Sequence, residues 1–161
     1  MTGRDGALHA RKTTRVDGPD LALRNVTYGL IVELGRVPTR LEVADAAEIA
    51  PPDVLEVWRR LHDAHALVLD ADGEIRMANP FSGVETPHRV QAAGRSWFAN
   101  CAWDAFGICA ALHEDGLIET ACPDCGEPIA VDLRHGQPDD ETLVFHCLVP
   151  ARRWWDDIVF T

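Results

Sequence analysis

The sequence predicts an α+β protein in which a helical half precedes a half built mainly from strands. Residues 21–63 place apolar side chains at three- and four-residue steps, the periodicity of amphipathic helices. Residues 67–78 form two short apolar runs around an Asp-Ala-Asp-Gly turn, and the later apolar runs are short and separated by turn formers. Helices followed by strands predict a mainly antiparallel sheet.

The size and composition fit a folded protein of one or two small domains. The chain has 161 residues, of which 47% are hydrophobic and 25% charged, as in globular proteins. Residues 1–20 lack apolar periodicity, so we expect a flexible tail there. We expect a helical module over 21–80 and a second module over 81–161.

The first module is predicted from helix start and stop signals. One helix begins at Leu21 and ends before Gly35, a second begins near Thr39, and a third follows Pro51 and Pro52. The Asp-Ala-Asp-Gly turn then makes a β-hairpin. Three short helices and a hairpin have the outline of a winged helix.

A winged helix raises the possibility of DNA binding through its third helix. That segment carries Arg59 and Arg60 among several acidic residues, and the whole chain has a formal net charge of −11. Phosphate binding requires clustered Lys and Arg. We therefore favour a helical scaffold and expect no nucleic-acid partner.

The second half begins after a segment rich in turn formers at residues 80–90. Its short apolar runs predict one helix among several strands. We expect the helix over residues 97–112 and strands over 84–90, 117–120, 129–133 and 143–149.

The cysteines carry the main chemical question. We expect a cytoplasmic protein without a membrane partner, because no apolar run approaches the roughly 20 residues that cross a bilayer and no signal peptide is evident. In a reducing compartment the five cysteines are expected to be free thiols, metal ligands or catalytic groups.

Cys101 and Asp104 lie three residues apart on the predicted helix and therefore on one face. Cys109 is eight residues from Cys101, a rise of roughly 12 Å, whereas two sulfurs sharing one metal ion lie within about 4.6 Å. We therefore interpret Cys109 as a buried core residue. Cys147 is predicted on a strand, facing away from His146, and taken alone it is better interpreted as a buried apolar thiol.

Cys122 and Cys125 form the segment CPDCG, a tight turn that can supply half of a tetrahedral zinc site. No second CxxC or closely spaced His pair completes it. A redox role lacks the expected βαβ context. The alternatives are a structural zinc site and a hairpin turn with one buried cysteine.

Three segments together resemble the organomercurial (alkylmercury) lyase family: NCAWDAFGICAAL, IETACPDCGEPIAVDL and FHCLVPARRWWDDIVF. The resemblance covers about residues 81–160, and that family also has a small winged-helix-like module before its catalytic domain. It implies that Cys101, Cys147 and Asp104 are catalytic and bind mercury, and that Cys122 is structural. Cys125 is an addition to the family pattern, and the family usually continues beyond the position of Thr161.

The resemblance implies protonolytic cleavage of carbon–mercury bonds in organomercurials. Two thiolates would bind the soft metal, and Asp104 would protonate the departing carbon. No cofactor would be required, Hg(II) would remain bound as product, external thiols would release it, and a mercuric reductase could accept it. Two alternatives stay open, a non-catalytic thiol protein that binds Hg, Cu or Zn and a metal-responsive winged-helix regulator. Motifs for phosphate, dinucleotide or hydrolase chemistry are missing.

Overall fold

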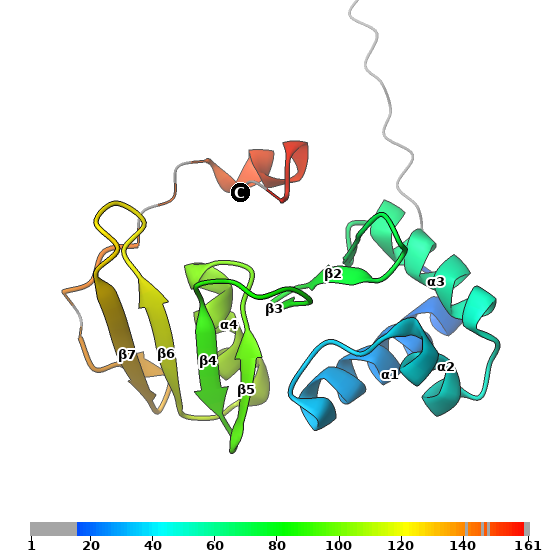
Figure 1. Cartoon of the computed structure of the whole chain (residues 1–161), viewed down its shortest axis with the longest axis horizontal. Helices are drawn as coiled ribbons and strands as arrows, with labels where there is room; N and C mark the ends of the chain where they lie inside the picture. The colour runs from blue at the N-terminus through cyan, green and yellow to red at the C-terminus, as the bar shows by residue number, and fades with distance from the viewer. Residues whose placement is uncertain (1–15, 141, 146, 148, 160–161) are drawn as a thin grey trace, which may run out of the picture.

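The computed structural model describes residues 16–140, 142–145, 147 and 149–159. These residues form a mixed helical and antiparallel α+β structure, which confirms the predicted class. A group of helices lies on one side, a larger sheet with one helix lies on the other, and a small sheet connects them (Figure 1). Of the tail predicted over residues 1–20, residues 1–15 fall outside the described residues, whereas residues 18–20 already belong to the first helix.

The helical side is formed by three consecutive helices. They are α1 (Gly18–Leu34), α2 (Arg40–Ala47) and α3 (Pro51–Asp63). The local signals explain their bounds: the Asp17 side chain caps α1, Gly35 ends it with a φ of 71°, and Thr39 forms a capping box with Glu42 at α2. Helix α1 therefore begins three residues before the predicted Leu21.

Asp20 ties the first and third helices together. Its carboxylate is almost fully buried and accepts hydrogen bonds from Nε and Nη2 of Arg60, the shortest at 2.7 Å. The Arg60 side chain remains 45% exposed, so the pair lies at the edge of the core. One of the two cations on α3 is thus engaged within the protein itself.

The predicted hairpin is present and belongs to a small antiparallel sheet. Within the described residues the strand order is β1 (Val68–Leu69), β2 (Ile75–Ala78) and β3 (Phe81–Ser82). Phe81 also bridges to Ala99 in the second half of the chain. The small sheet therefore connects the two sides.

The larger sheet is antiparallel throughout, with strand order β5-β4-β6-β7-β8 in the described part of the chain. Helix α4 (Ala102–Leu112) packs against β4 and β6. A 3-10 helix, η1 (Ala151–Asp156), follows near the C-terminus. The strands are β4 (Arg89–Ala92), β5 (Arg95–Phe98), β6 (Gly116–Ala121), β7 (Pro128–Arg134) and β8 (Gln137–Pro138).

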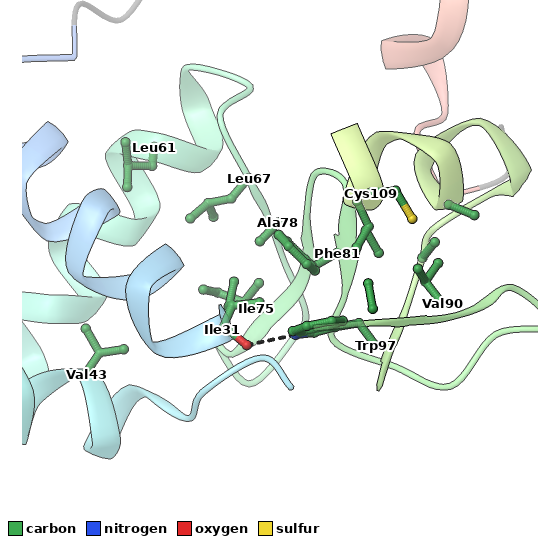
Figure 2. Close-up of a cluster of buried hydrophobic side chains, with 14 of the residues drawn as sticks. Ile31, Val43, Leu61, Leu67, Ile75, Ala78, Phe81, Val90, Trp97 and Cys109 are labelled. Atoms are coloured by element: carbon green, nitrogen blue, oxygen red, sulfur yellow. Dashed lines mark hydrogen bonds between the residues drawn. The ribbon is translucent and has the colours of Figure 1, made fainter. Parts of the chain in front are cut away.

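A continuous cluster of buried side chains joins the two sides (Figure 2). Trp97 on β5 is 3% exposed, and its indole Nε1 donates a 2.9 Å hydrogen bond to the backbone oxygen of Ile31 on α1. Phe81 lies between these elements, with its ring centroid 6.0 Å from that of Trp97. The core thus fixes the helices relative to the sheet that carries the site.

Three sequence-based boundaries were wrong. The strand predicted over 84–90 is β4, which begins at Arg89, because pairing with β6 and not the apolar run sets its limits. Residues 97 and 98, which were predicted to begin the helix over 97–112, belong to β5 instead, since β4 pairs with them. The described residues between 143 and 149 form no strand.

No helix in the described part of the chain is long and apolar enough to span a membrane.

Candidate active site

Cys101 and Asp104 lie together at the start of α4, as the spacing predicted, although Cys101 is not itself helical. Cys101 occupies the N-cap position with extended backbone angles, φ −151° and ψ 177°, and its carbonyl accepts a 3.0 Å hydrogen bond from the amide of Ala105. Asp104 belongs to the first helical turn. The positive end of the helix dipole therefore lies near both groups and favours negative charge there.

Asn100 holds the carboxyl group of Asp104 in place. Its side-chain Nδ2 donates to Oδ2 of Asp104 at 3.1 Å and also lies 3.0 Å from Oδ1 of Asn79 and 3.3 Å from the carbonyl of Pro80. Oδ1 of Asn100 is buried without a hydrogen-bond partner among the described residues. The amide is thus oriented by three acceptors, one of which is Asp104.

The protonation of both site groups is shifted toward the neutral form. Burial raises the pKa of Asp104, while hydrogen bonds from Asn100 and Cys101 act in the opposite direction. Burial also raises the pKa of Cys101. The backbone N–H of Asp104 lowers this pKa through a hydrogen bond, whereas the negative charge of Asp104 raises it further. Both shifts favour the protonated form of the group concerned.

A cavity of about 260 Å³ opens over this pair. Residues from the small sheet and its following turn, from the start of α4 and the loops around it, and from the C-terminal segment line it. They are Met77, Asn79, His88, Asn100, Cys101, Trp103, Asp104, Trp154, Ile158 and Val159.

His88 presents a neutral ring to the cavity. Burial lowers its pKa, and its Nδ1 lies 2.7 Å from the hydroxyl of Thr120. Sequence reasoning did not identify His88, Asn79, Asn100 or Trp154 as residues of the site. A signal for Asn100 existed in its position beside Cys101, whereas His88 lies just before β4 and Asn79 lies in the turn after β2.

The structure does not bring Cys147 into this group. Its side chain is exposed, and its Sγ donates a 2.9 Å hydrogen bond to the carbonyl of Val149, which also accepts from Nε1 of Trp154 at 2.7 Å. In the described residues, no three His, Cys, Asp or Glu side chains are close enough together to hold a metal ion. His146, which was predicted to face away from Cys147, lies outside the described residues.

One contact nevertheless places the Cys147 segment beside α4. The ring of Phe145 lies 5.8 Å, centroid to centroid, from that of Trp103, which lines the cavity. Only one residue separates Phe145 from Cys147, so at most roughly 7 Å of extended backbone joins them. Phe145 thus contacts a residue that lines the cavity, although neither Phe145 nor Cys147 lines it.

The remaining cysteines occupy two different environments. Cys109 is 3% exposed and points into the core between α4 and the sheet (Figure 2), as predicted. Cys122 and Cys125 lie in the loop between β6 and β7, where Cys125 is exposed. The pKa of Cys122 is lowered by hydrogen bonds from the backbone of Cys125, the backbone of Asp124 and the side chain of Cys125.

The fold and cavity define an α+β protein with a thiol and a carboxyl group paired at a helix start, an arrangement suited to soft-metal and proton chemistry. The family model MerB, alkylmercury lyase, matches residues 81–161, half of the chain. The chain therefore belongs to the alkylmercury lyase family, which confirms the resemblance read from its sequence.

A solved structure agrees with this assignment. The crystal structure of the mercury-bound form of MerB2 is similar, with a TM-score of 0.60 and 25% sequence identity. The match covers 81% of this chain and 65% of that one, so this chain spans about two thirds of that protein's length. A search of curated proteins found no match.

Proposed function

We propose that the protein cleaves carbon–mercury bonds in organomercurials by protonolysis, releasing a hydrocarbon and thiolate-bound Hg(II). The observation that carries this proposal is the Cys101–Asp104 pair, held at the start of α4 beneath the cavity. A soft sulfur ligand and a proton carrier adjacent to it are the two groups that such a reaction needs. The family membership supports the same chemistry.

The first step is capture of R–Hg⁺ by Cys101. Its raised pKa means that the sulfur enters the reaction as a thiol, so formation of the Hg–S bond must release a proton. Asp104 is within hydrogen-bonding reach of that sulfur and accepts the proton as a carboxylate. Burial, which raises the pKa of Asp104, favours this transfer.

In the second step, Cys147 joins the mercury and loses its own proton to solvent. Two sulfur donors increase the electron density on mercury and weaken its bond to carbon. Asp104 then delivers its proton to the departing carbon, so that R–Hg⁺ and two thiols yield R–H, a neutral Hg(II) dithiolate and one proton. Cys147 must exchange its contact with Val149 for the cavity, and the Phe145–Trp103 contact keeps it nearby.

The other roles in this proposal follow from the chemistry of the product. No cofactor takes part, external thiols displace Hg(II) from the two cysteines, and a mercuric reductase is a suitable acceptor. We place the reaction in the cytoplasm, where such thiols are abundant.

For the first half of the chain we propose a winged-helix-like module over residues 21–80 that supports the catalytic domain over 81–161. The three helices and small sheet support that description. The pairing of Arg60 with Asp20 favours a scaffold over a DNA-reading helix, because it occupies one of the two cations of α3.

The deciding experiment is incubation with phenylmercury and excess thiol, followed by detection of benzene. We expect benzene from the wild-type protein and none from Cys101→Ser or Cys147→Ser. Asp104→Ala should still bind mercury but lose turnover. A protein that binds phenylmercury without producing benzene would be a thiol-based metal carrier, and wild-type turnover in either cysteine variant would refute the residue assignment.

A further inference from the structure

The loop between β6 and β7 presents a pair of cysteines that the proposed reaction does not use. Strand pairing ends at Ala121 and Pro128, and the six residues between them form the loop. The amide of Cys122 donates to the carbonyl of Glu127 at 2.9 Å, and the amide of Gly126 donates to the carbonyl of Cys122 at 2.8 Å. These bonds fold the loop into a compact turn at the end of the hairpin (Figure 1).

Both thiols are accessible in this turn and lie beside one another. Cys125 is exposed and Cys122 is partly exposed, and the two side chains are within hydrogen-bonding reach. The backbone N–H groups of Asp124 and Cys125 are directed toward the Cys122 sulfur. This differs from Cys109, whose sulfur is buried against the sheet.

The surroundings of the pair restrict which ion it can bind. Structural zinc requires four ligands, commonly Cys or His. In the described part of the chain no third His, Cys, Asp or Glu side chain joins the two sulfurs in a possible metal cluster. A soft cation that is satisfied by two thiolates fits better, since it needs only two sulfurs within about 4.6 Å of each other.

We propose that Cys122 and Cys125 together bind one Hg(II) ion, at a second mercury site separate from the cavity above Cys101. Both thiols lose a proton, two Hg–S bonds form, and the neutral dithiolate complex adds no charge beside Asp124 and Glu127. None of the residues that line the cavity belongs to this loop. The site does not depend on cleavage of organomercurials, because inorganic Hg(II) is its ligand.

The turn should retain mercury against ordinary monothiols. Once one sulfur holds the ion, the second is present at an effective concentration set by the short loop, in the millimolar range or higher. A free monothiol at a much lower concentration cannot replace both sulfurs at once. Loss of either cysteine should therefore weaken retention by at least about tenfold.

The test uses the full-length reduced protein with Cys101 and Cys147 both changed to Ser, which removes the proposed catalytic sulfurs. The variant is titrated with inorganic Hg(II) in the presence of micromolar free cysteine, and binding is followed by ultraviolet thiolate-to-mercury absorption and by bound metal after gel filtration. We expect about one Hg(II) per chain. Adding Cys122→Ser or Cys125→Ser should weaken this retention by at least about tenfold.

Asp124→Asn is the matched control, because it changes the same turn but leaves both sulfurs, and it should retain the ion. Far-ultraviolet circular dichroism of each variant establishes that the fold persists. The proposal is overturned if the Cys101→Ser/Cys147→Ser protein retains no more mercury than the form that also lacks Cys122 and Cys125. Preferential uptake of Zn(II) over Hg(II) by the turn would overturn it as well.

Discussion

The side-chain amide of Asn100 donates a 3.1 Å hydrogen bond to the carboxylate of Asp104, directly beside the Cys101 sulfur. The bond stabilises the ionised carboxylate and so opposes burial, which raises the pKa of Asp104. Asn100 is therefore placed to decide how readily Asp104 takes a proton from Cys101 and passes it on. In the proposed reaction it is a positioning residue.

Replacement of Asn100 by Leu should raise the pKa of Asp104 further, because the hydrogen bond that lowers it is lost. We expect the limb of the pH–rate profile that reports Asp104 to move to higher pH, with kcat/KM lower by about tenfold, the equivalent of about 1.4 kcal/mol. The measurement is benzene release from phenylmercury over a range of pH. Asn79→Ala is the control, since it removes another acceptor of Asn100 and leaves the bond to Asp104 intact. An unmoved limb in Asn100→Leu would refute this role.

Asp104 should also reduce the stability of the fold at neutral pH. Its folded pKa is raised, so its contribution to stability is fully present below the unfolded pKa, near 3.9, and is lost as pH rises through the folded value. We expect Asp104→Asn to have a higher free energy of unfolding than wild type at pH 7 and an equal one near pH 3.5. Urea denaturation at both pH values tests this.

The exposed Asp140 provides a control of opposite sign. Hydrogen bonds from Thr142 lower its pKa, so its contribution is present above the unfolded pKa and is lost as pH falls. Asp140→Asn should thus decrease stability at pH 7, where Asp104→Asn increases it. Equal responses of the two variants would contradict the assigned directions.

The helical half could be predicted because its signals are local. Gly35 ends α1 and the capping box at Thr39 begins α2 in the structure as in the sequence. Strand limits could not be read in the same way. Trp97 looks like an early helical residue, but pairing with Val90 and its bond to Ile31 place it on β5. Tertiary contacts there override the local pattern.

The candidate site was predictable only where it depends on neighbours in sequence. Cys101 and Asp104 are three residues apart and meet at the start of α4. The apolar run around Cys147 has the composition of a buried strand. In the described residues, however, the strand that pairs with β7 on the side away from β6 is β8. The other cavity residues, such as His88 and Trp154, are brought together only by the tertiary fold.

The contact between Phe145 and Trp103 should control how often Cys147 reaches the mercury held by Cys101. Both rings are substantially exposed, so the contact contributes only about 0.5–1.5 kcal/mol. We expect Phe145→Ala to slow benzene release several-fold while the initial loss of one thiol on capture of phenylmercury is unchanged. Val144→Ala, at a side chain that is 88% exposed, should leave both rates as they are. Slowing of capture itself in Phe145→Ala would count against this explanation.

Gly116 on β6 lies where the core has no room for a side chain. A Cβ at this position would stand 2.7 Å from the sulfur of Cys109 and 2.9 Å from the backbone oxygen of Gln91. We expect Gly116→Ala to lower the free energy of unfolding by about 1–3 kcal/mol, measured by urea denaturation, because a strand must shift. Gly29→Ala is the matched control: nothing lies within 4 Å of its Cβ on α1, and alanine there should be neutral or stabilising.

A double variant separates the two clashes at Gly116. Cys109→Ala should relieve the clash with sulfur but not the one with Gln91. Measured in the Cys109→Ala background, Gly116→Ala should therefore lower the free energy of unfolding by less than it does in the wild type, but still lower it. Full additivity of the Gly116 and Cys109 changes would show that the sulfur does not limit the space at Gly116.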